Sequence, residues 1–322
     1  MPSSSSPLVR PWPRDRSGVL AMAQTWSDPE RVAVNVEAVA ELAPRTIQAP
    51  PSGAMGQPVT GKGWDDLPEA FELRLALNTI NHMFWSHDAQ GDLVRYAWGS
   101  EVGAMGMCAA FQAGWDDPHS TLGQARHEGR PLSVADITRT FGDIPDPEGR
   151  RCILNEVLLS PRLGAWGQVL TDEVIRHASK KDGPVLFSTQ LAACLADDFP
   201  MGYGDLVLKK AQLAVSQMWR EAAVRGFDQG CELTAFADYQ IPNVLRAMGL
   251  LMYDESLAER VDAGVLIPAD SDDERAIRGA SILAVEALAT QQGVSVADVD
   301  YWLWLRRKVP TTPFHLTLTT AY

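Results

Sequence analysis

Apolar residues recur at helical spacing along most of this chain. In residues 27–43 they return every three or four positions after Ser27, which predicts a helix with Ser27 as its N-cap. Residues 67–85 are apolar on several faces, a pattern typical of a buried helix. Residues 204–227 carry one apolar stripe and predict a long amphipathic helix.

Polar residues mark where further helices begin. Ser133, Ser271 and Ser295 each carry an acidic residue three positions later, the pattern of a capping box. Pro242 is expected in the first turn of a helix, where its missing N–H has no partner to lose. Runs of β-forming residues are short, and residues 93–99 predict at most a small β-hairpin.

These patterns together predict the organisation of the chain. We expect a mainly α protein, with a single helical domain over residues 26–322. Residues 1–25 begin with a polar, proline-rich stretch, so we expect them to form a flexible N-terminal segment. Residues 50–63 are rich in glycine and proline, and we expect them to form a flexible link.

Charge and composition narrow the possible partners. The formal net charge is −13 at pH 7, which argues against a protein that binds the phosphate backbone of nucleic acids. No apolar run reaches the length of a membrane helix, and no targeting segment stands at the start. We therefore expect a cytoplasmic protein with a small-molecule partner, and we predict neither a nucleic-acid nor a membrane partner. The four cysteines, Cys108, Cys152, Cys194 and Cys231, are scattered and form no metal-binding motif with the histidines. We therefore expect reduced thiols, no bound metal and no cofactor.

Asp238 is an acidic residue inside an apolar run, four positions before Pro242. If Pro242 starts a helix, the free N–H groups and the helix dipole favour an ionised carboxylate at Asp238. Apolar neighbours such as Phe236 act in the opposite direction by desolvation. A poorly solvated carboxylate can activate water or stabilise a cationic transition state. On spacing alone, the more frequent role is a helix cap or a turn aspartate.

Six segments in the same order resemble the queuosine salvage protein family. The most specific is "LTAFADYQIPNVLRAMG", which contains Asp238 and resembles the family's Leu-Thr-x-Phe-Ala-Asp-Tyr-Arg-x-Pro-x-Val-Leu stretch. The resemblance covers nearly all of the chain after its proline-rich start. The other segments are "INHMFW", "GAMGMCAAF", "GDLVLKKAQLAV", "ERAIRGASILAVEAL" and "VDYWLWLRRK" with "HLTLTTAY".

The resemblance implies a fold and a reaction. The family's fold is similar to that of the helix-hairpin-helix DNA glycosylases, in which an aspartate beside a helix N-terminus acts on the N-glycosidic bond. The implied reaction hydrolyses queuosine 5′-phosphate to queuine and ribose 5-phosphate, with Asp238 as the catalytic carboxylate. Queuine is a 7-deazapurine, so the departing base must be stabilised through N3, N1 or O6 instead of N7. The sequence alone does not identify the donors that would do this.

The resemblance also implies a phosphate site. Lys209 and Lys210 lie at the start of a helix, where a phosphate would meet ammonium and backbone N–H groups. The alternative is that both lysines are solvated. His315 and Tyr322, in the closing segment, are further candidates for the phosphate.

Candidates for the base are mainly aromatic. Phe84, Trp85 and Phe236 could contact the base, although aromatic residues at the end of an apolar helix more often belong to a core. Asp205 is either the cap of the following helix, which we favour, or an acceptor for the N–H edge of the base. We assign Glu274 to an ion pair or a cap.

Three positions depart from the family pattern. Gln240, Leu316 and Leu318 stand where the family usually has arginine. Either those arginines make only structural pairs, or this chain acts on a less anionic substrate, such as a nucleoside. Two alternatives therefore stay open: a hydrolase of another 7-deazapurine nucleoside or nucleotide, and a non-catalytic base- or nucleotide-binding protein.

Overall fold

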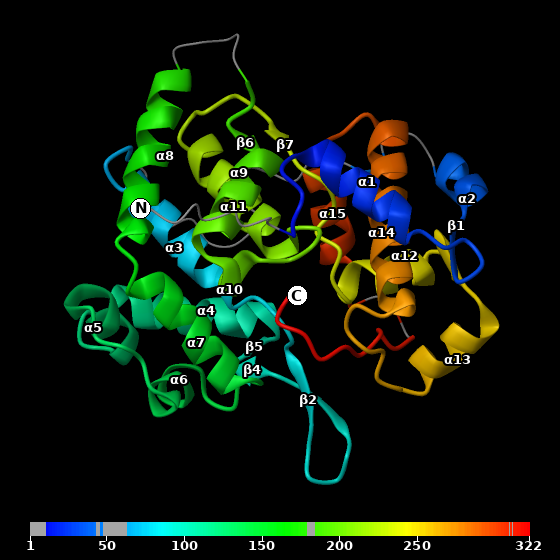
Figure 1. Cartoon of the computed structure of the whole chain (residues 1–322), viewed down its shortest axis with the longest axis horizontal. Helices are drawn as coiled ribbons and strands as arrows, with labels where there is room; N and C mark the ends of the chain where they lie inside the picture. Colours follow the sequence, from blue (N-terminus) through cyan, green and yellow to red (C-terminus); the bar gives the residue numbers. More distant parts are fainter. Residues whose placement is uncertain (1–10, 43–45, 48–62, 179–183, 309, 311) are drawn as a thin grey trace, which may run out of the picture.

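A computed structural model describes residues 11–42, 46–47, 63–178, 184–308, 310 and 312–322. Within these ranges the chain is mainly helical, as the sequence predicts (Figure 1). The helices are α1 (Arg16–Trp26), α2 (Val36–Glu41), α3 (Leu67–Thr79), α4 (Ala104–Asp116), α5 (Thr121–Glu128), α6 (Val134–Phe141), α7 (Pro147–Leu158), α8 (Arg162–Ala178), α9 (Thr189–Asp198), α10 (Pro200–Tyr203), α11 (Lys209–Ala223), α12 (Gln240–Ala247), α13 (Glu255–Asp262), α14 (Asp272–Gln292) and α15 (Val296–Leu305).

The described strands form four two-stranded sheets, more than the single small hairpin expected. Residues 93–99 do form hairpins, but they divide between two of them. The other two pairings join segments far apart in the sequence, which a local pattern cannot reveal. The pairs are β1 (Val32–Val34) with β8 (Leu251–Tyr253), β2 (Trp85–His87) with β3 (Leu93–Arg95), β4 (Ala97–Trp98) with β5 (Glu101–Val102), and β6 (Phe187–Ser188) in parallel with β7 (Cys231–Glu232).

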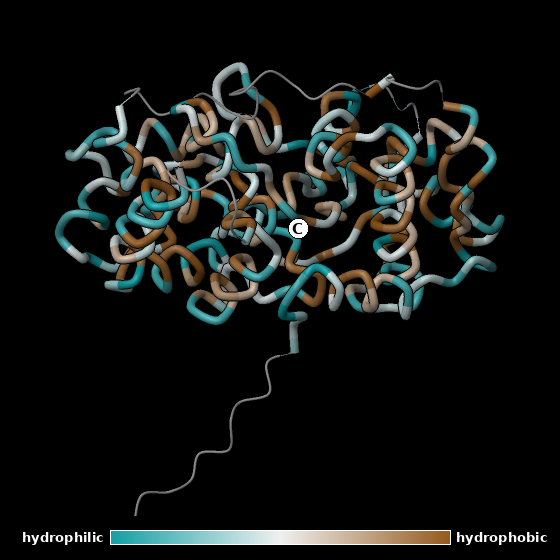
Figure 2. Tube along the Cα trace, turned by 90° about the horizontal axis from the view of Figure 1, so that it is seen from above, coloured by the Kyte–Doolittle hydropathy of each residue, from teal (hydrophilic) through white to brown (hydrophobic). Residues whose placement is uncertain are grey.

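The helices form two groups that lie side by side (Figure 1). In one group α3 packs against α8 and α11, and in the other α14 packs against α1, α12 and α15. The closing segment, residues 314–322, is drawn in red between the groups (Figure 1), and the C-terminus also lies near the middle of the molecule when it is seen from above (Figure 2). The Met83 N–H donates to the Tyr322 carbonyl, while the Tyr322 hydroxyl donates to Glu274 on α14. This segment therefore connects the two groups of helices.

Helix α1 corrects the expected boundary at residue 25. The helix begins at Arg16 and buries Val19, Ala23 and Trp26 against α14. At the crossing, a Cβ on Gly279 would lie 2.8 Å from the Ala23 carbonyl oxygen, so glycine permits the close approach. Residues 16–26 are thus a packed part of the fold, because their apolar stripe finds a partner far along the chain. Residues 1–10 lie outside the described residues.

The helix predicted over residues 27–43 is wrong in its first part. Ser27 ends α1, and residues 32–34 form β1, which pairs with β8 in the register Val32↔Tyr253. Only α2 is helical, and Asn35 caps it by accepting the N–H of Ala38. The distant strand partner overrides the local helical spacing, because β-branched valines favour a strand over a helix. Residues 43–45 and most of the predicted link at 50–63 lie outside the described residues.

The helix predicted over residues 67–85 ends early, at Thr79. Met83 has a positive φ of 37°, and Trp85 begins β2. Phe84 and Trp85 are therefore not on the helix, because residues 80–85 turn to reach the closing segment and the hairpin. By contrast, the serine caps are confirmed at Ser133, Ser271 and Ser295.

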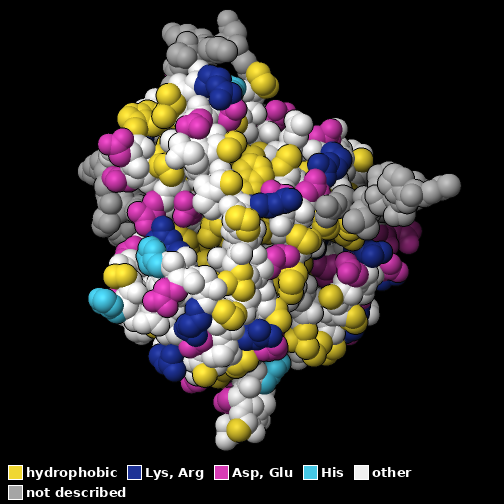
Figure 3. Space-filling model, turned by 60° about the vertical axis from the view of Figure 1, so that its left-hand side comes forward, with side chains coloured by type: hydrophobic (Ala, Val, Ile, Leu, Met, Phe, Trp, Pro, Cys, Tyr) yellow, Lys and Arg dark blue, Asp and Glu magenta, His cyan; other side chains and the backbone are white. Residues whose placement is uncertain are grey.

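The surface and the helices bear on possible partners. On the face drawn in Figure 3, lysine and arginine side chains are interspersed with aspartate and glutamate. Within the described ranges, every helix is too short or too polar to pass through a membrane.

Candidate active site

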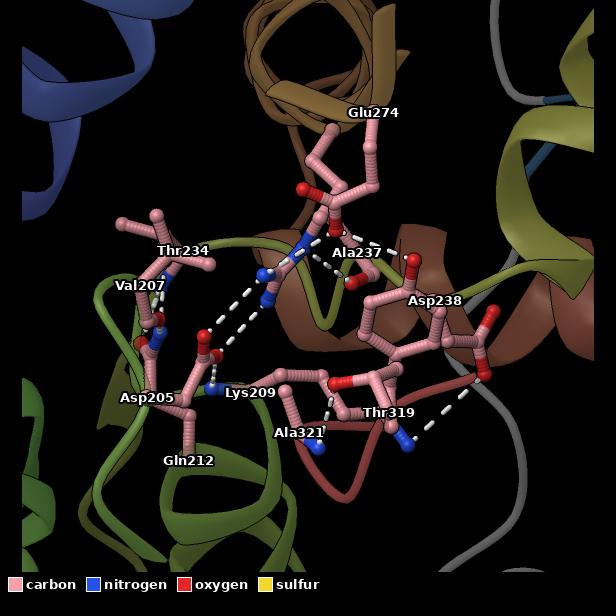
Figure 4. Close-up of polar contacts among 12 residues, drawn as sticks. Asp205, Val207, Lys209, Gln212, Thr234, Ala237, Asp238, Glu274, Thr319 and Ala321 are labelled. Atoms are coloured by element: carbon pink, nitrogen blue, oxygen red, sulfur yellow. Dashed lines mark hydrogen bonds and ion pairs between the residues drawn. The ribbon is translucent and has the colours of Figure 1, made fainter. Parts of the chain in front are cut away.

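Asp238 lies two residues before the start of α12, as predicted from Pro242. Its Oδ1 accepts the N–H groups of Gln240 at 2.7 Å and Ile241 at 3.0 Å. The capping role is therefore confirmed for one carboxylate oxygen. The other oxygen, Oδ2, lies 3.7 Å from the Nζ of Lys209, and the side chain is 13% exposed (Figure 4). Capping thus occupies half of the carboxylate and leaves the other half beside an ammonium group.

Lys209 connects Asp238 with Asp205. It is the first residue of α11, and its backbone N–H donates to Asp205 Oδ2 at 2.8 Å. Its side chain is buried, and burial lowers the pKa of Lys209, while the carboxylates of Asp238, Asp300 and Asp205 act in the opposite direction. The alternative that Lys209 is solvated is therefore wrong, and its role as a phosphate ligand stays a prediction.

Lys210 is also buried but points elsewhere. Its Nζ donates to the Thr79 carbonyl at 2.6 Å, at the end of α3. Burial holds the pKa of Lys210 well below its usual range, and the positive charges of Lys209 and Arg150 lower it further. One of the three ammonium donors is used in this bond, so two are available to a ligand.

A cavity of about 220 Å³ lies between the two groups of helices. Lys210, Asp205 and Glu274 line this cavity. Lys209 and Asp238 do not line it, but the backbone N–H of Lys209 binds the carboxylate of Asp205 in the cavity wall. The full lining is residues 201–206, Lys210, residues 269–270, Glu274, Arg278 and residues 319–321.

Arg278 ties the cavity wall to the catalytic candidate. Its guanidinium binds both oxygens of Asp205, at 3.0 and 2.7 Å, and its Nε donates to the Ala237 carbonyl at 3.2 Å. Burial acts against the charge, but Asp205 and Glu274 raise the pKa of Arg278, so it stays cationic. Sequence reasoning did not single out Arg278, although it lies in one of the family-like segments.

Asp205 acts as a cap, the role favoured for it, and contact with the base stays a prediction. Helix α11 begins later than expected, at Lys209, after Leu208 in a left-handed conformation with φ 58°. Asp205 is therefore not adjacent to the helix, yet its carboxylate accepts an N–H of the first turn, as a cap does. It also lines the cavity.

His315 and Tyr322 lie behind the cavity lining. The Tyr322 hydroxyl donates to Glu274 Oε1 at 2.9 Å, and His315 Nε2 lies 3.3 Å from that hydroxyl. Burial, with the charge of Arg278, lowers the pKa of His315 to about 3, so the imidazole is neutral. The cavity is instead lined by their neighbours at residues 319–321.

The aromatic candidates lie in two separate clusters, and none lines the cavity. Phe84 and Phe236 belong to the main core. The guanidinium of Arg150 lies 5.7 Å from the centre of the Phe84 ring. Trp85 belongs to a small cluster with Tyr239, Phe314, Leu316 and Tyr322.

A scan against protein-family models matches residues 64–322 to the queuosine salvage protein. The chain belongs to the queuosine salvage protein family. A relative from Sphaerobacter thermophilus is 29% identical, over 96% of this chain and 99% of its own length. A relative from Bos taurus is 26% identical over 76% and 79%, and one from Nematostella vectensis is 37% identical over 35% and 41%. All three are named queuosine 5′-phosphate N-glycosylase/hydrolase.

The three departures from the family's usual arginines fall in different surroundings. Leu316 is buried in the small cluster beside Trp85, while Leu318 is 60% exposed. Gln240 begins α12, and its backbone N–H binds Asp238. Apolar packing thus takes the place of a charge at residue 316, and neither leucine lines the cavity.

Asp300 was missed by the sequence reasoning. It is buried on α15, and its Oδ2 accepts the N–H of Phe236 at 2.8 Å. Burial, with the nearby charge of Asp238, raises the pKa of Asp300 to about 7, against the effects of Phe236 and Lys209. A carboxylate in the apolar segment "VDYWLW" was the available signal. Among the described residues, no group of three or more His, Cys, Asp and Glu side chains is placed to hold a metal ion.

Proposed function

We propose that this chain hydrolyses the N-glycosidic bond of queuosine 5′-phosphate and releases queuine and ribose 5-phosphate. The observation that carries the proposal is that the two carboxylate oxygens of Asp238 have different contacts. Oδ1 caps α12, and Oδ2 lies beside the ammonium group of Lys209. Family membership and the names of the relatives support the same reaction.

Asp238 is proposed as the catalytic carboxylate. Its Oδ1 accepts two backbone N–H groups, and its Oδ2 lies 3.7 Å from the Lys209 ammonium nitrogen. As the bond from C1′ to the base nitrogen breaks, positive charge grows on C1′ and O4′, and a nearby carboxylate stabilises it. Water then forms the new C1′–O bond and loses one proton, which finally protonates the base that departed with the electron pair of the broken bond. The same carboxylate can accept that proton from water during attack.

Lys210 is proposed as the phosphate ligand. It lines the cavity and has ammonium donors to spare, whereas Lys209 is held between Asp205 and Asp238. A charge-assisted bond from a buried ammonium to phosphate is stronger than one at the surface. We further propose that the substrate is a free nucleotide in the cytoplasm, in agreement with the net charge of −13.

A second candidate function is hydrolysis of a 7-deazapurine nucleoside. It is favoured by the uncharged residues Gln240, Leu316 and Leu318, at positions where the family usually has arginine. Fewer cations would suit a substrate without a phosphate.

One assay separates these possibilities. The protein is incubated with queuosine 5′-phosphate, queuosine and guanosine 5′-phosphate, and free base is quantified by chromatography. The proposal predicts rapid release of queuine from queuosine 5′-phosphate and little release of free base from the other two. Faster release from queuosine would favour the nucleoside hydrolase, and tight binding without release would favour a non-catalytic binding protein.

A further inference from the structure

One carboxylate oxygen of Glu274 accepts a hydrogen bond, and the other has no hydrogen-bond partner among the described residues. It lies in the first turn of α14, and its side chain is 3% exposed. Oε1 accepts the Tyr322 hydroxyl at 2.9 Å and lies 3.5 Å from an Arg278 nitrogen. Oε2 is buried and has no hydrogen-bond partner among the described residues. In Figure 4 the dashed lines at Glu274 meet only one of its two oxygens.

An unpartnered buried carboxylate oxygen is unfavourable, so its presence needs a reason. Burial raises the pKa of Glu274, while the Arg278 charge and the Tyr322 hydrogen bond act to lower it. Leaving such an acceptor without a donor costs stability that a bound N–H group would restore. A ligand that brings a donor to Oε2 is therefore favoured.

Glu274 is one of the residues that line the cavity. Three carboxylates line it: Asp205, Asp270 and Glu274. Both oxygens of Asp205 already bind Arg278, and Asp270 is exposed to solvent. Glu274 is thus the buried carboxylate of this wall with acceptor capacity to spare.

We propose that Glu274 is a specificity-determining residue that reads the hydrogen-bond donor edge of the substrate base. This inference rests on the proposed function and adds the residue that recognises the base. A guanine-type ring presents N1–H and a 2-amino group side by side, and a carboxylate accepts from such donors. An adenine-type ring presents a single donor on this edge, the 6-amino group, beside a lone pair at N1 that a carboxylate oxygen repels. The site therefore selects a 2-amino-6-oxo ring.

The test uses Glu274→Gln, with Asp272→Asn as the matched control. Asp272 is an exposed acid in the same first turn of α14, and it does not line the cavity. Binding of free 7-deazaguanine and 7-deazaadenine is measured by calorimetry. Glu274→Gln should weaken 7-deazaguanine by about 10- to 100-fold, the size of one charge-assisted hydrogen bond. Its binding of 7-deazaadenine should stay unchanged or improve, and the control should match the parent protein.

A second variant, Tyr322→Phe, separates reading of the base from support of the fold. It removes the partner of Oε1 and leaves Oε2 untouched, so selectivity for 7-deazaguanine should persist. If Glu274→Gln weakens both bases equally, or if Tyr322→Phe abolishes selectivity to the same extent, Glu274 is a structural residue and the inference is wrong. The parent protein failing to prefer 7-deazaguanine would also overturn it.

Binding and turnover report on different claims. Base release from queuosine 5′-phosphate by the parent protein tests the proposed function, whereas calorimetry with free bases tests Glu274. Selective binding without release would contradict the proposed function and leave the inference standing. Release with selectivity that Glu274→Gln does not change would do the reverse.

Discussion

Replacing Lys210 with methionine should weaken a nucleotide far more than the matching nucleoside. The substitution keeps a long apolar stem in a buried position and removes the ammonium group of a residue that lines the cavity. Thr79 uses one of its three donors, so the remaining two can bind phosphate oxygens. A charge-assisted hydrogen bond contributes about 1.5 to 3 kcal/mol, so nucleotide affinity should fall about 10- to 150-fold. Nucleoside affinity should change little.

The assay compares kcat/KM for queuosine 5′-phosphate and queuosine in the parent protein, Lys210→Met and Lys209→Met. Lys209 is the matched control, because it is a buried lysine of the same helix turn that pairs with Asp238 and does not line the cavity. Lys209→Met should therefore affect both substrates alike. Equal losses for both substrates in Lys210→Met would refute the reasoning and leave Lys210 as a support for the end of α3.

Phosphate binding should also be coupled to proton uptake. Burial and the charges of Lys209 and Arg150 hold the pKa of Lys210 well below its usual range, and a phosphate beside it would raise that pKa. Above the pKa of the free protein, binding must then take up a proton. Calorimetry in buffers with different ionisation enthalpies should show this uptake in the parent protein, and Lys210→Met should lack it.

Two further predictions concern stability. In the folded protein the pKa of Asp300 is raised to about 7, so the stability that Asp300 contributes is fully present below about pH 4 and is lost as the pH rises through 7. Urea unfolding of Asp300→Asn between pH 4 and 8 should lack that loss. If the free energy of unfolding of the variant falls with pH as it does in the parent protein, the assignment is wrong. Arg278→Met leaves the buried carboxylates of Asp205 and Glu274 without their cation, so the free energy of unfolding should fall by about 3 to 5 kcal/mol. A melting temperature equal to that of the parent protein would show that the Arg278 ion pairs do not stabilise the fold.

Local chemistry explains which helices could be predicted. The helices after Ser133, Ser271 and Ser295 begin where expected, because a cap depends only on residues within one turn. The expectation failed at residues 27–43 and 80–85, where β1 pairs with β8 and the chain turns toward Tyr322. Such contacts depend on partners far along the sequence. The similarity to helix-hairpin-helix glycosylases stays a prediction.

Some residues of the candidate site could likewise be predicted from the sequence, and others could not. Asp238 could be found from the sequence because Pro242 marks the start of the helix beside it. Arg278 and Asp300 could not, because their importance arises from partners on other helices. The sequence predicts an ion pair or a cap for Glu274, and the residue does contact Arg278, but only the fold shows that its second carboxylate oxygen has no partner among the described residues.

The most direct test of the central claim is base release by Asp238→Asn. The amide oxygen can still accept the N–H groups of Gln240 and Ile241, so the fold and the melting temperature should be retained. A neutral amide neither accepts a proton nor opposes positive charge on the ribose. Release of queuine from queuosine 5′-phosphate should therefore fall at least about a hundred- to ten-thousand-fold, while the nucleotide still binds. Release at nearly the parent rate would show that Asp238 only caps α12 and would contradict the mechanism.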